Sequence, residues 1–346
     1  MRKPRTDARR GGVGSCKLRV VKAIVVDAPG DESAMHLGEV PAPALAPGCI
    51  RIRVAATAVN RADLLQRQGL YPPPPGASEI LGLECAGEIV ETAADVEGWR
   101  AGDRAMALLA GGGYAEEVVV HAGSAMRVPE RLSLEQAAAV PEVFLTVFLN
   151  VFRLGALPEG GAVLVHGGGS GIGTAAIQLV KAAGATLVVT AGSEEKCRRC
   201  LELGADRAVN YRSDDFVEAA RSASGGRGVD VVLDSIGAPY LEKNLAALAV
   251  GGKLVVIGLM GGARTEIGLG PLLVRRLEVI GSTLRARPES EKASIVAAFQ
   301  GRFDAALEKG EIRPIVDRVL PLEQAPEAHR LVKASEHFGK VVLRVA

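Results

Sequence analysis

Aromatic residues are scarce in this sequence and account for only 3% of its 346 positions. Because hydrophobic residues still reach 48%, the packed cores must be built mainly from Ala, Val, Leu and Ile, and a disordered chain is disfavoured. An uninterrupted apolar run of roughly 18 residues is also lacking. The nearest candidate, 137–152, is interrupted by Pro141, Glu142 and Asn150. We therefore expect no transmembrane helix and no membrane partner.

An excess of charge of one sign is absent as well. The 41 Lys and Arg residues are balanced by 40 Asp and Glu residues, so there is no electrostatic argument for a nucleic-acid partner. Residues 1–19 are the exception: their net charge is +6, which leaves −5 for the rest of a chain whose total is +1. This segment has no apolar core like that of a secretory signal. We expect a disordered extension, with a basic tail for an acidic partner as the alternative.

The sequence also lacks the spacings of a metal centre or a nucleophilic triad. Its five cysteines are odd in number and scattered, which favours reduced thiols and a cytoplasmic protein. Cys197 and Cys200 form a single CxxC pair inside a predicted helix, where packing is the expected role. The histidines show no ligand spacing: His36, His121, His166, His329 and His337.

The chain has two regions with different sequence patterns. From about 20 to 135, short β-like runs alternate with Gly- and Pro-rich turns, which is typical of a sandwich or a partly open barrel. Beyond residue 133, strand and helix patterns alternate, with strands expected at 162–166, 186–192, 207–211, 229–237, 253–262 and 277–284, and a helix within 239–252. This alternation predicts an α/β fold with a Rossmann doubly wound parallel sheet. Further strands are expected at 314–322 and 339–345.

The stretch HGGGSGIGTAA, residues 166–176, holds five glycines between the first strand of the alternating region and its first helix. It fits the dinucleotide fingerprint as Gly171-x-Gly173-x-x-Ala176, in the strand–turn–helix context that the fingerprint requires. A P-loop is excluded because Gly173 is followed by Thr174 without a lysine. We expect a pyrophosphate at this helix start, with 167–169 shaping the turn.

The second strand of the alternating region ends without an acidic residue. An acid at that place holds the ribose 2′-hydroxyl of NAD, whereas Ser193 and Lys196 suit a 2′-phosphate. We therefore expect NADPH as the cofactor, although Glu194 and Glu195 lie close by, and Lys196 can equally be a solvated helix residue.

Several stretches resemble the zinc-independent quinone oxidoreductases of the medium-chain dehydrogenase/reductase superfamily, most closely the tumour-suppressor-induced branch of animals and its bacterial relatives. They are AVNRADLLQRQGLYPPPPGASEILGLE (58–84), GDRAMALLAGGG (102–113), SGIGTAAIQL (170–179), EKNLAALAVGGKLVVIGLMGG (242–262) and FGKVVL (338–343). The resemblance implies a GroES-like β-barrel catalytic domain, 20–142 and 287–346, split by a Rossmann NADPH-binding domain, 143–286. Since members start with Met-Lys-Ala, translation is expected to start near Val21.

The resemblance also implies roles for individual residues. The pyrophosphate is assigned to Ser170, Gly171, Ile172, Gly173 and Thr174, and the adenosine 2′-phosphate to Gly192, Ser193, Lys196 and Tyr211. Four residues at strand ends are expected to face the nicotinamide half: Ile236, Gly237, Leu259 and Met260. Thr146 is a further cofactor candidate. Simple turn, packing or helix roles remain open for Tyr211, Thr146 and the strand-end group.

On the acceptor side, Asn60 and Tyr71 are the catalytic candidates. Asn60 and Leu83 stand where zinc relatives carry ligands, so no zinc is expected. Asn60 is expected to bind a quinone oxygen or the nicotinamide ribose, or to cap a strand end. Tyr71, before four prolines, is expected to orient the quinone or to supply a proton, or to anchor its loop.

These features predict an NADPH-dependent quinone reductase that transfers hydride directly to the acceptor. The alternatives are an enone or enoyl thioester C=C reductase, and a protein that binds NADPH without turnover. The resemblance also implies a homodimer.

Overall fold

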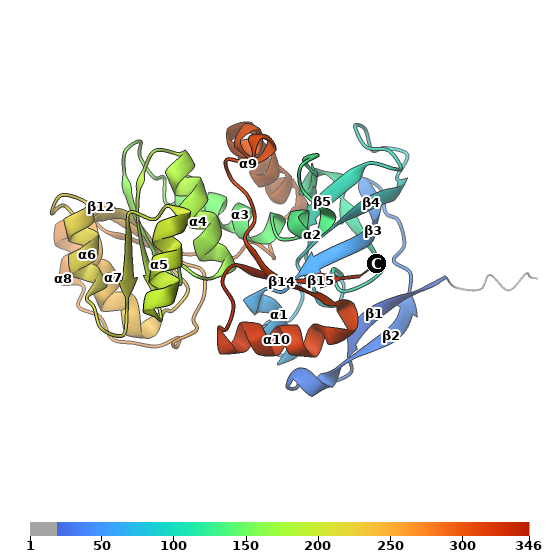
Figure 1. The fold of residues 1–346 in the computed structure, drawn as a ribbon, viewed down its shortest axis with the longest axis horizontal. Coiled ribbons are helices and arrows are strands. Elements are labelled where there is room, and N and C mark those ends of the chain that lie inside the picture. The colour runs from blue at the N-terminus through green and yellow to red at the C-terminus, as the bar shows by residue number, and fades with distance from the viewer. Residues whose placement is uncertain (1–18, 346) are drawn as a thin grey trace, which may run out of the picture.

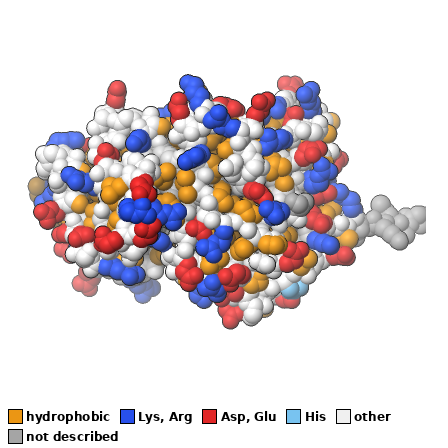
Figure 2. All heavy atoms as spheres, in the orientation of Figure 1, with side chains coloured by type: hydrophobic (Ala, Val, Ile, Leu, Met, Phe, Trp, Pro, Cys, Tyr) orange, Lys and Arg blue, Asp and Glu red, His pale blue; other side chains and the backbone are white. Residues whose placement is uncertain are grey.

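The computed structural model describes residues 19–345, and the extension expected at 1–19 lies outside the described residues except for Arg19. The described chain forms a parallel sheet and a mostly antiparallel sheet, which Figure 1 shows as two bodies with helix α3 (Pro141–Val147) between them. Figure 2 shows acidic and basic side chains interspersed over the same face.

The parallel sheet has six strands in the order β10-β9-β8-β11-β12-β13, which is the predicted doubly wound Rossmann arrangement. Its first strand in the chain lies in the middle, so the strand order reverses between β8 and β11. The strands are β8 (Ala162–His166), β9 (Thr186–Ala191), β10 (Arg207–Asn210), β11 (Val229–Asp234), β12 (Leu248–Val256) and β13 (Glu278–Gly281).

Helices cover both faces of this sheet because successive side chains of a strand point to opposite sides. In β8, Val163 packs in the core cluster that holds Ile177 of α4, whereas Leu164 packs in the cluster that holds Phe216 of α6. The helices of this unit are α4 (Gly171–Ala182), α5 (Glu194–Leu203), α6 (Phe216–Ala223), α7 (Leu241–Ala247) and α8 (Gly270–Arg275).

The second sheet joins the two ends of the described chain. Its order is β14-β15-β3-β4-β5-β7, with β6 paired to β3, so the late strands return to the first region as predicted. A separate pair, β1 (Val20–Val26) and β2 (Met35–Pro41), lies beside it. The other strands are β3 (Cys49–Ala58), β4 (Glu84–Thr92), β5 (Arg104–Leu108), β6 (Glu117–His121), β7 (Ala125–Arg127), β14 (Val316–Pro321) and β15 (Lys340–Arg344). The helices are α1 (Arg61–Arg67), α2 (Leu134–Ala137), α9 (Glu289–Lys309) and α10 (Ala325–Ala334).

Five of the seven phenylalanines gather where the two units meet. Rings of Phe144, Phe148 and Phe152, from α3 and the π-helical segment Phe148–Leu154, pack with Phe299 and Phe303 of α9 at centroid distances of 5.4 to 6.4 Å. By length and composition the helical stretch Leu134–Leu154 is apolar enough to cross a membrane, contrary to our expectation. However, 78% of its most apolar window is buried inside the protein, so this aromatic junction accounts for its composition.

The helix expected within 239–252 is present as α7, but the strand expected at 253–262 starts and ends earlier, as β12 (Leu248–Val256). Leu248 is fully buried and pairs with Val229 of β11. A short apolar run reads equally well as helix or strand, and pairing in the sheet decided the outcome here.

Candidate active site

The glycine turn after β8 is closed around its own backbone. Gly167 has a φ of +77°, which favours glycine. A Cβ on Gly173 would overlap the carbonyl oxygen of Gly167 and the Cα of Gly168, so this helix start packs directly on the turn. Ser170 Oγ accepts the N–H of Gly173 at 3.0 Å, and its carbonyl accepts that of Thr174. The N–H groups of Gly171 and Ile172, which lie between Ser170 and Gly173, have no backbone partner in this turn and can bind an anion.

The other wall of the turn comes from the antiparallel unit. The Gly339 N–H donates to the Gly169 carbonyl at 2.9 Å. A Cβ on Gly171 would lie 2.5 Å from Lys340 Cδ and 3.1 Å from Val143 Cγ1 of α3. The glycine turn therefore lies at the contact between the two units.

The four residues expected around the 2′-phosphate come together at the ends of β9 and β10. Ser193 caps α5 by accepting the Lys196 N–H at 3.3 Å. A Cβ on Gly192 would lie 2.7 Å from the Tyr211 hydroxyl, and the Tyr211 side chain is exposed. The Lys196 ammonium donates to the Ser335 carbonyl at 2.6 Å, and burial lowers its pKa. Their role in holding a phosphate stays a prediction.

The strand-end residues expected near the nicotinamide also lie together. Gly237 has a φ of +85°, and a Cβ there would lie 2.7 Å from the Gly262 carbonyl oxygen. The N–H of Gly261 donates to the Ile236 carbonyl at 2.7 Å, which joins the loops after β11 and β12. Leu259 and Met260, in the second of these loops, are more than half exposed. Thr146 lies apart from them on α3 and is nearly buried.

Asn60 lies between two charged groups. Its Nδ2 donates to Glu84 Oε1 at 2.9 Å, and its Oδ1 accepts from Lys340 Nζ at 2.6 Å. Lys340 Nζ also lies 2.7 Å from Glu84 Oε1, and both side chains are buried. The second Nδ2 hydrogen is donated to the Ala58 carbonyl. Asn60 therefore has its donors occupied and holds Lys340 against Glu84.

Tyr71 is held by a buried arginine from the segment that follows β13. The Arg285 guanidinium carbon lies 5.4 Å from the centre of the Tyr71 ring, and Nη1 donates to the Tyr71 carbonyl at 3.3 Å. Arg285 Nη2 also donates to Gln66 Oε1 at 2.7 Å. Burial and the nearby Glu142 carboxyl raise the pKa of the Tyr71 phenol. This environment makes Tyr71 a poorer acid than a free phenol and favours a positioning role.

A buried hydrogen-bond chain supports Asn60 from behind. Arg67 Nη1 can only donate, so His329 accepts at Nδ1 (3.2 Å) and donates from Nε2 to the Tyr114 hydroxyl (3.1 Å). That hydroxyl donates to Asp63 Oδ2, which also accepts the Asn60 N–H at 2.8 Å. Burial lowers the pKa of His329 to about 3 and raises that of Asp63 to about 6. The neutral histidine thus fixes the Tyr114 hydroxyl, which in turn fixes Asp63 against the backbone of Asn60 at the start of α1.

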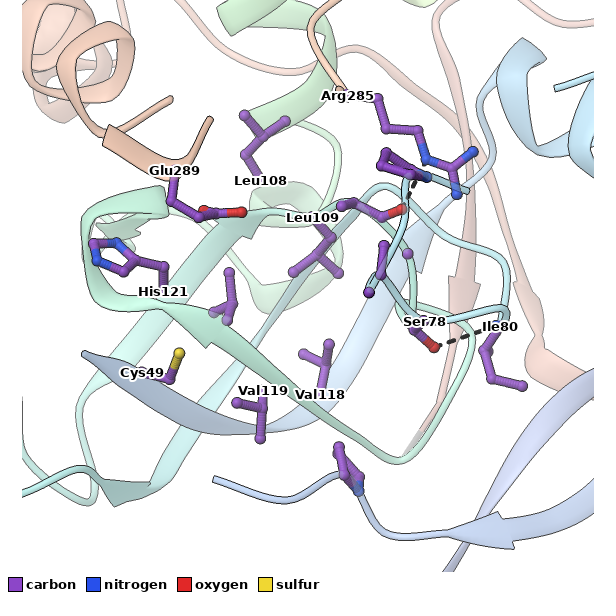
Figure 3. A pocket seen from close by; sticks show the side chains of 18 of the residues that line it. Cys49, Ser78, Ile80, Leu108, Leu109, Val118, Val119, His121, Arg285 and Glu289 are labelled. Carbon is purple, nitrogen blue, oxygen red and sulfur yellow. Dashed lines mark hydrogen bonds between the residues drawn. The ribbon is translucent and has the colours of Figure 1, made fainter. Parts of the chain in front are cut away.

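A cavity of about 740 Å³ opens on the antiparallel unit (Figure 3). Ser78, Leu109, His121 and Glu289 line it, and Arg285 lies at one edge. None of the residues assigned to the dinucleotide lines this cavity. Arg285 is therefore shared between this cavity and the Tyr71 loop.

The side chains present do not fit a catalytic zinc ion. Asn60 stands where the resemblance places a ligand in zinc-containing relatives, and it offers an amide there. The Lys340 ammonium already lies against Glu84 and supplies positive charge to it. Within residues 19–345, no group of three or more His, Cys, Asp or Glu is placed to hold a metal. Cys197 and Cys200 are buried in α5, and burial raises the pKa of both thiols.

Four site residues escaped the sequence analysis: Glu84, Glu142, Arg285 and Lys340. Each lies far from the others in the chain, and only folding brings them to Asn60 and Tyr71. The FGK stretch that contains Lys340 was a signal, because it carried part of the resemblance, but nothing in its local pattern indicated where the lysine points.

Comparisons with known proteins agree with this architecture. Residues 46–130 match the family model described as alcohol dehydrogenase GroES-like domain, and residues 171–299 match the one described as zinc-binding dehydrogenase. The quinone oxidoreductase of Lama guanicoe is 30% identical over 328 residues, which cover 94% of this chain and 98% of that protein.

Two solved structures extend the comparison. The Escherichia coli quinone oxidoreductase complexed with NADPH is 29% identical, with a TM-score of 0.84 over 94% of this chain and 100% of that one. An NAD-dependent alcohol dehydrogenase is 34% identical, with a TM-score of 0.82 and the same coverage. The likeness therefore spans both units, while the similar proteins differ in the cofactor named for them.

Proposed function

This chain belongs to the medium-chain dehydrogenase/reductase superfamily, and from that premise we propose that it is an NADPH-dependent quinone reductase without catalytic zinc. The observation that carries the proposal is the contact between the two units. A glycine turn suited to a pyrophosphate forms one side of it, and the other side offers Asn60, Lys340 and Glu84 in place of metal ligands.

The residues of the turn suit the pyrophosphate of NADPH. Glycines leave room for it, and the start of α4 supplies free N–H groups and the positive end of a helix dipole. Ser193 and Lys196, with no acidic residue at the end of β9, favour the 2′-phosphate over a bare ribose. When bound, the cofactor supplies a hydride from its nicotinamide ring.

The remaining work falls to this chain's own side chains. Tyr71 and Arg285 orient a planar acceptor, and Asn60 keeps the Lys340 ammonium beside it as a fixed positive charge. A fixed charge of this kind stabilises negative charge that develops on a quinone oxygen, because it needs no reorganisation during the reaction.

The proposal is tested by steady-state kinetics with NADPH and NADH, each against ortho-quinones, enones and enoyl thioesters. We expect quinone reduction with a clear preference for NADPH. Preference for NADH would overturn the 2′-phosphate assignment. Reduction of enones or enoyl thioesters alone would favour the C=C reductase, and tight NADPH binding without turnover would favour a binding protein.

We also propose a homodimer formed through the edge of the parallel sheet. Within the described residues β13 pairs with β12 alone, so one of its edges is unpaired. Nearby on α8, Leu273 and Val274 are 78% and 80% exposed. Light scattering should give twice the monomer mass for the natural chain and the monomer mass for Val274→Glu. A natural chain of monomer mass would refute the dimer.

A further inference from the structure

The carboxyl group of Glu142, in the first turn of α3, has no role assigned to it so far. Its Oε2 is buried and accepts no hydrogen bond from the described residues. The residue as a whole is partly exposed, so the side chain is not sealed in a core. We propose that Glu142 is the carboxylic acid that donates a proton to the reduced acceptor. This inference rests on the proposed function.

The hydrogen bonds around Glu84 indicate which of the two neighbouring carboxyl groups holds a proton. Glu84 Oε1 receives Asn60 Nδ2 at 2.9 Å and Lys340 Nζ at 2.7 Å, and Oε2 receives the backbone N–H of Glu142 at 2.9 Å. Every one of these contacts stabilises an ionised Glu84. Two adjacent carboxylates in a buried site do not both ionise readily, so Glu142 carries the proton.

Charged groups from every side bear on this proton. Burial first, and then the neighbouring Glu84, raise the pKa of Glu142 to about 8. Asp63 of α1 acts in the same direction, whereas Lys340 of β15 and Arg285 oppose it. Tyr71 faces the same carboxyl group and is neutral near pH 7. Glu142 is therefore mostly protonated at neutral pH yet acidic enough to release its proton.

The position of the helix brings this carboxyl group to the reacting region. Val143, the next residue, touches the phosphate-binding turn at Gly171, and Thr146 lies one helical turn further along the same face. Tyr71 of the antiparallel unit and Arg285 of the segment after β13 both act electrostatically on the Glu142 carboxyl group or receive its effect. In the proposed arrangement, an acceptor held by Tyr71 reaches both the glycine turn and Glu142.

The proton balance is simple. Reduction of a quinone takes a hydride, supplied by the dihydronicotinamide, and one proton. Addition of the hydride to the quinone gives a hydroquinone monoanion. The O–H bond of Glu142 then breaks as the second O–H bond of the hydroquinone forms, and water returns a proton to the carboxylate before the next turnover.

The decisive variant is Glu142→Gln, which keeps the shape of a neutral carboxyl group but has no proton to give. Infrared difference spectra of the cofactor-free chain, natural minus variant, should contain the C=O band of a protonated carboxyl group at neutral pH, lost as the pH rises past about 8. We expect kcat with a quinone to fall by about 10²-fold. The NADPH dissociation constant should stay unchanged.

A matched control is Glu218→Gln, which removes an exposed acid from the first turn of α6. This control should retain the C=O band in its own spectrum and the natural kcat. Glu218 also interacts with a helix dipole, but it is exposed and is not proposed to donate a proton. An ionised Glu142 at neutral pH, or a variant with the natural kcat at all pH values, would overturn the proposal. Absence of turnover in the natural chain would instead overturn the proposed function, and the infrared band reports on Glu142 independently of it.

Discussion

The two sides of the proposed active site are built in opposite ways. The side proposed to hold the cofactor, the cofactor wall, is local: one strand, one turn and one helix start within residues 162–182, and its contacts are made mainly by backbone atoms. The side proposed to hold the acceptor, the acceptor wall, is assembled from β4, α1, α3, β15 and the segment after β13, and most of its contacts involve charged side chains. The first depends on side chains being absent, whereas the second depends on buried charges being matched.

The difference has an energetic side. A tight backbone turn is destabilised when a substitution adds an atom that overlaps neighbouring backbone atoms. A matched buried charge fails by loss of its partner, because an uncompensated charge remains in a poorly solvated site. The four changes below act on one wall or the other, and their matched controls separate the two kinds of failure.

The largest effect is expected for Lys340→Met on the acceptor wall. It leaves the fully buried Glu84 without its ammonium partner, which should lower the free energy of unfolding by about 3–5 kcal/mol. Urea denaturation measures the loss. The double variant Glu84→Gln/Lys340→Met removes both charges and should recover much of the stability; equal losses in the two variants would mean that the pair is not coupled.

Gly173→Ala on the cofactor wall comes next. The added Cβ meets the backbone of residues 167 and 168, which cannot move as a flexible side chain does. We expect a loss of about 1–3 kcal/mol and of measurable NADPH binding by fluorescence titration. Gly301→Ala in α9, where a Cβ has open space, is the control and should leave binding intact. Normal NADPH affinity in Gly173→Ala would rule out this turn as the phosphate site.

Ser170→Val tests the hydroxyl at the start of α4. It removes the bond to the Gly173 N–H, at a cost of about 1 kcal/mol, and with it the contact that holds the glycine turn in the shape proposed for phosphate binding. Ser133→Val removes the corresponding cap of α2, far from the turn, and should cost a similar amount. NADPH titration should separate them, with weaker binding in Ser170→Val alone. Equal affinities would leave Ser170 a purely structural cap.

The last effect is of another kind, a pH dependence of stability that comes from the acceptor wall. Because the pKa of Glu142 rises from an ordinary 4.5 to about 8 on folding, its stabilising contribution is complete below 4.5 and is lost as pH rises through 8. Glu142→Gln should therefore gain stability relative to the natural chain across that window, measured by thermal unfolding at several pH values. A difference that is constant with pH would mean that the folded pKa is not raised.

The same contrast explains what could be predicted from sequence. The glycine spacing and the strand and helix periods are local, so the parallel sheet and the strand–turn–helix geometry at residues 162–182 could be predicted from neighbouring residues. Lys340 lies 256 positions beyond Glu84 in the chain, and no local pattern links them. Arg285 and Glu142 read as an ordinary basic residue and an interruption of an apolar run. Their roles arise only when distant strands pair.

The hydrogen bond from Gly339 to Gly169 also has a consequence for synthesis of the protein. The parallel sheet is complete in the nascent chain once β13 has emerged from the ribosome, and domains generally fold as units in the order in which they are made. The antiparallel sheet is incomplete until β14 and β15 have been made, and these two are translated last among its strands. The glycine turn therefore gains its contact with Gly339 only as translation is ending, so the proposed active site is complete only after both units have been made.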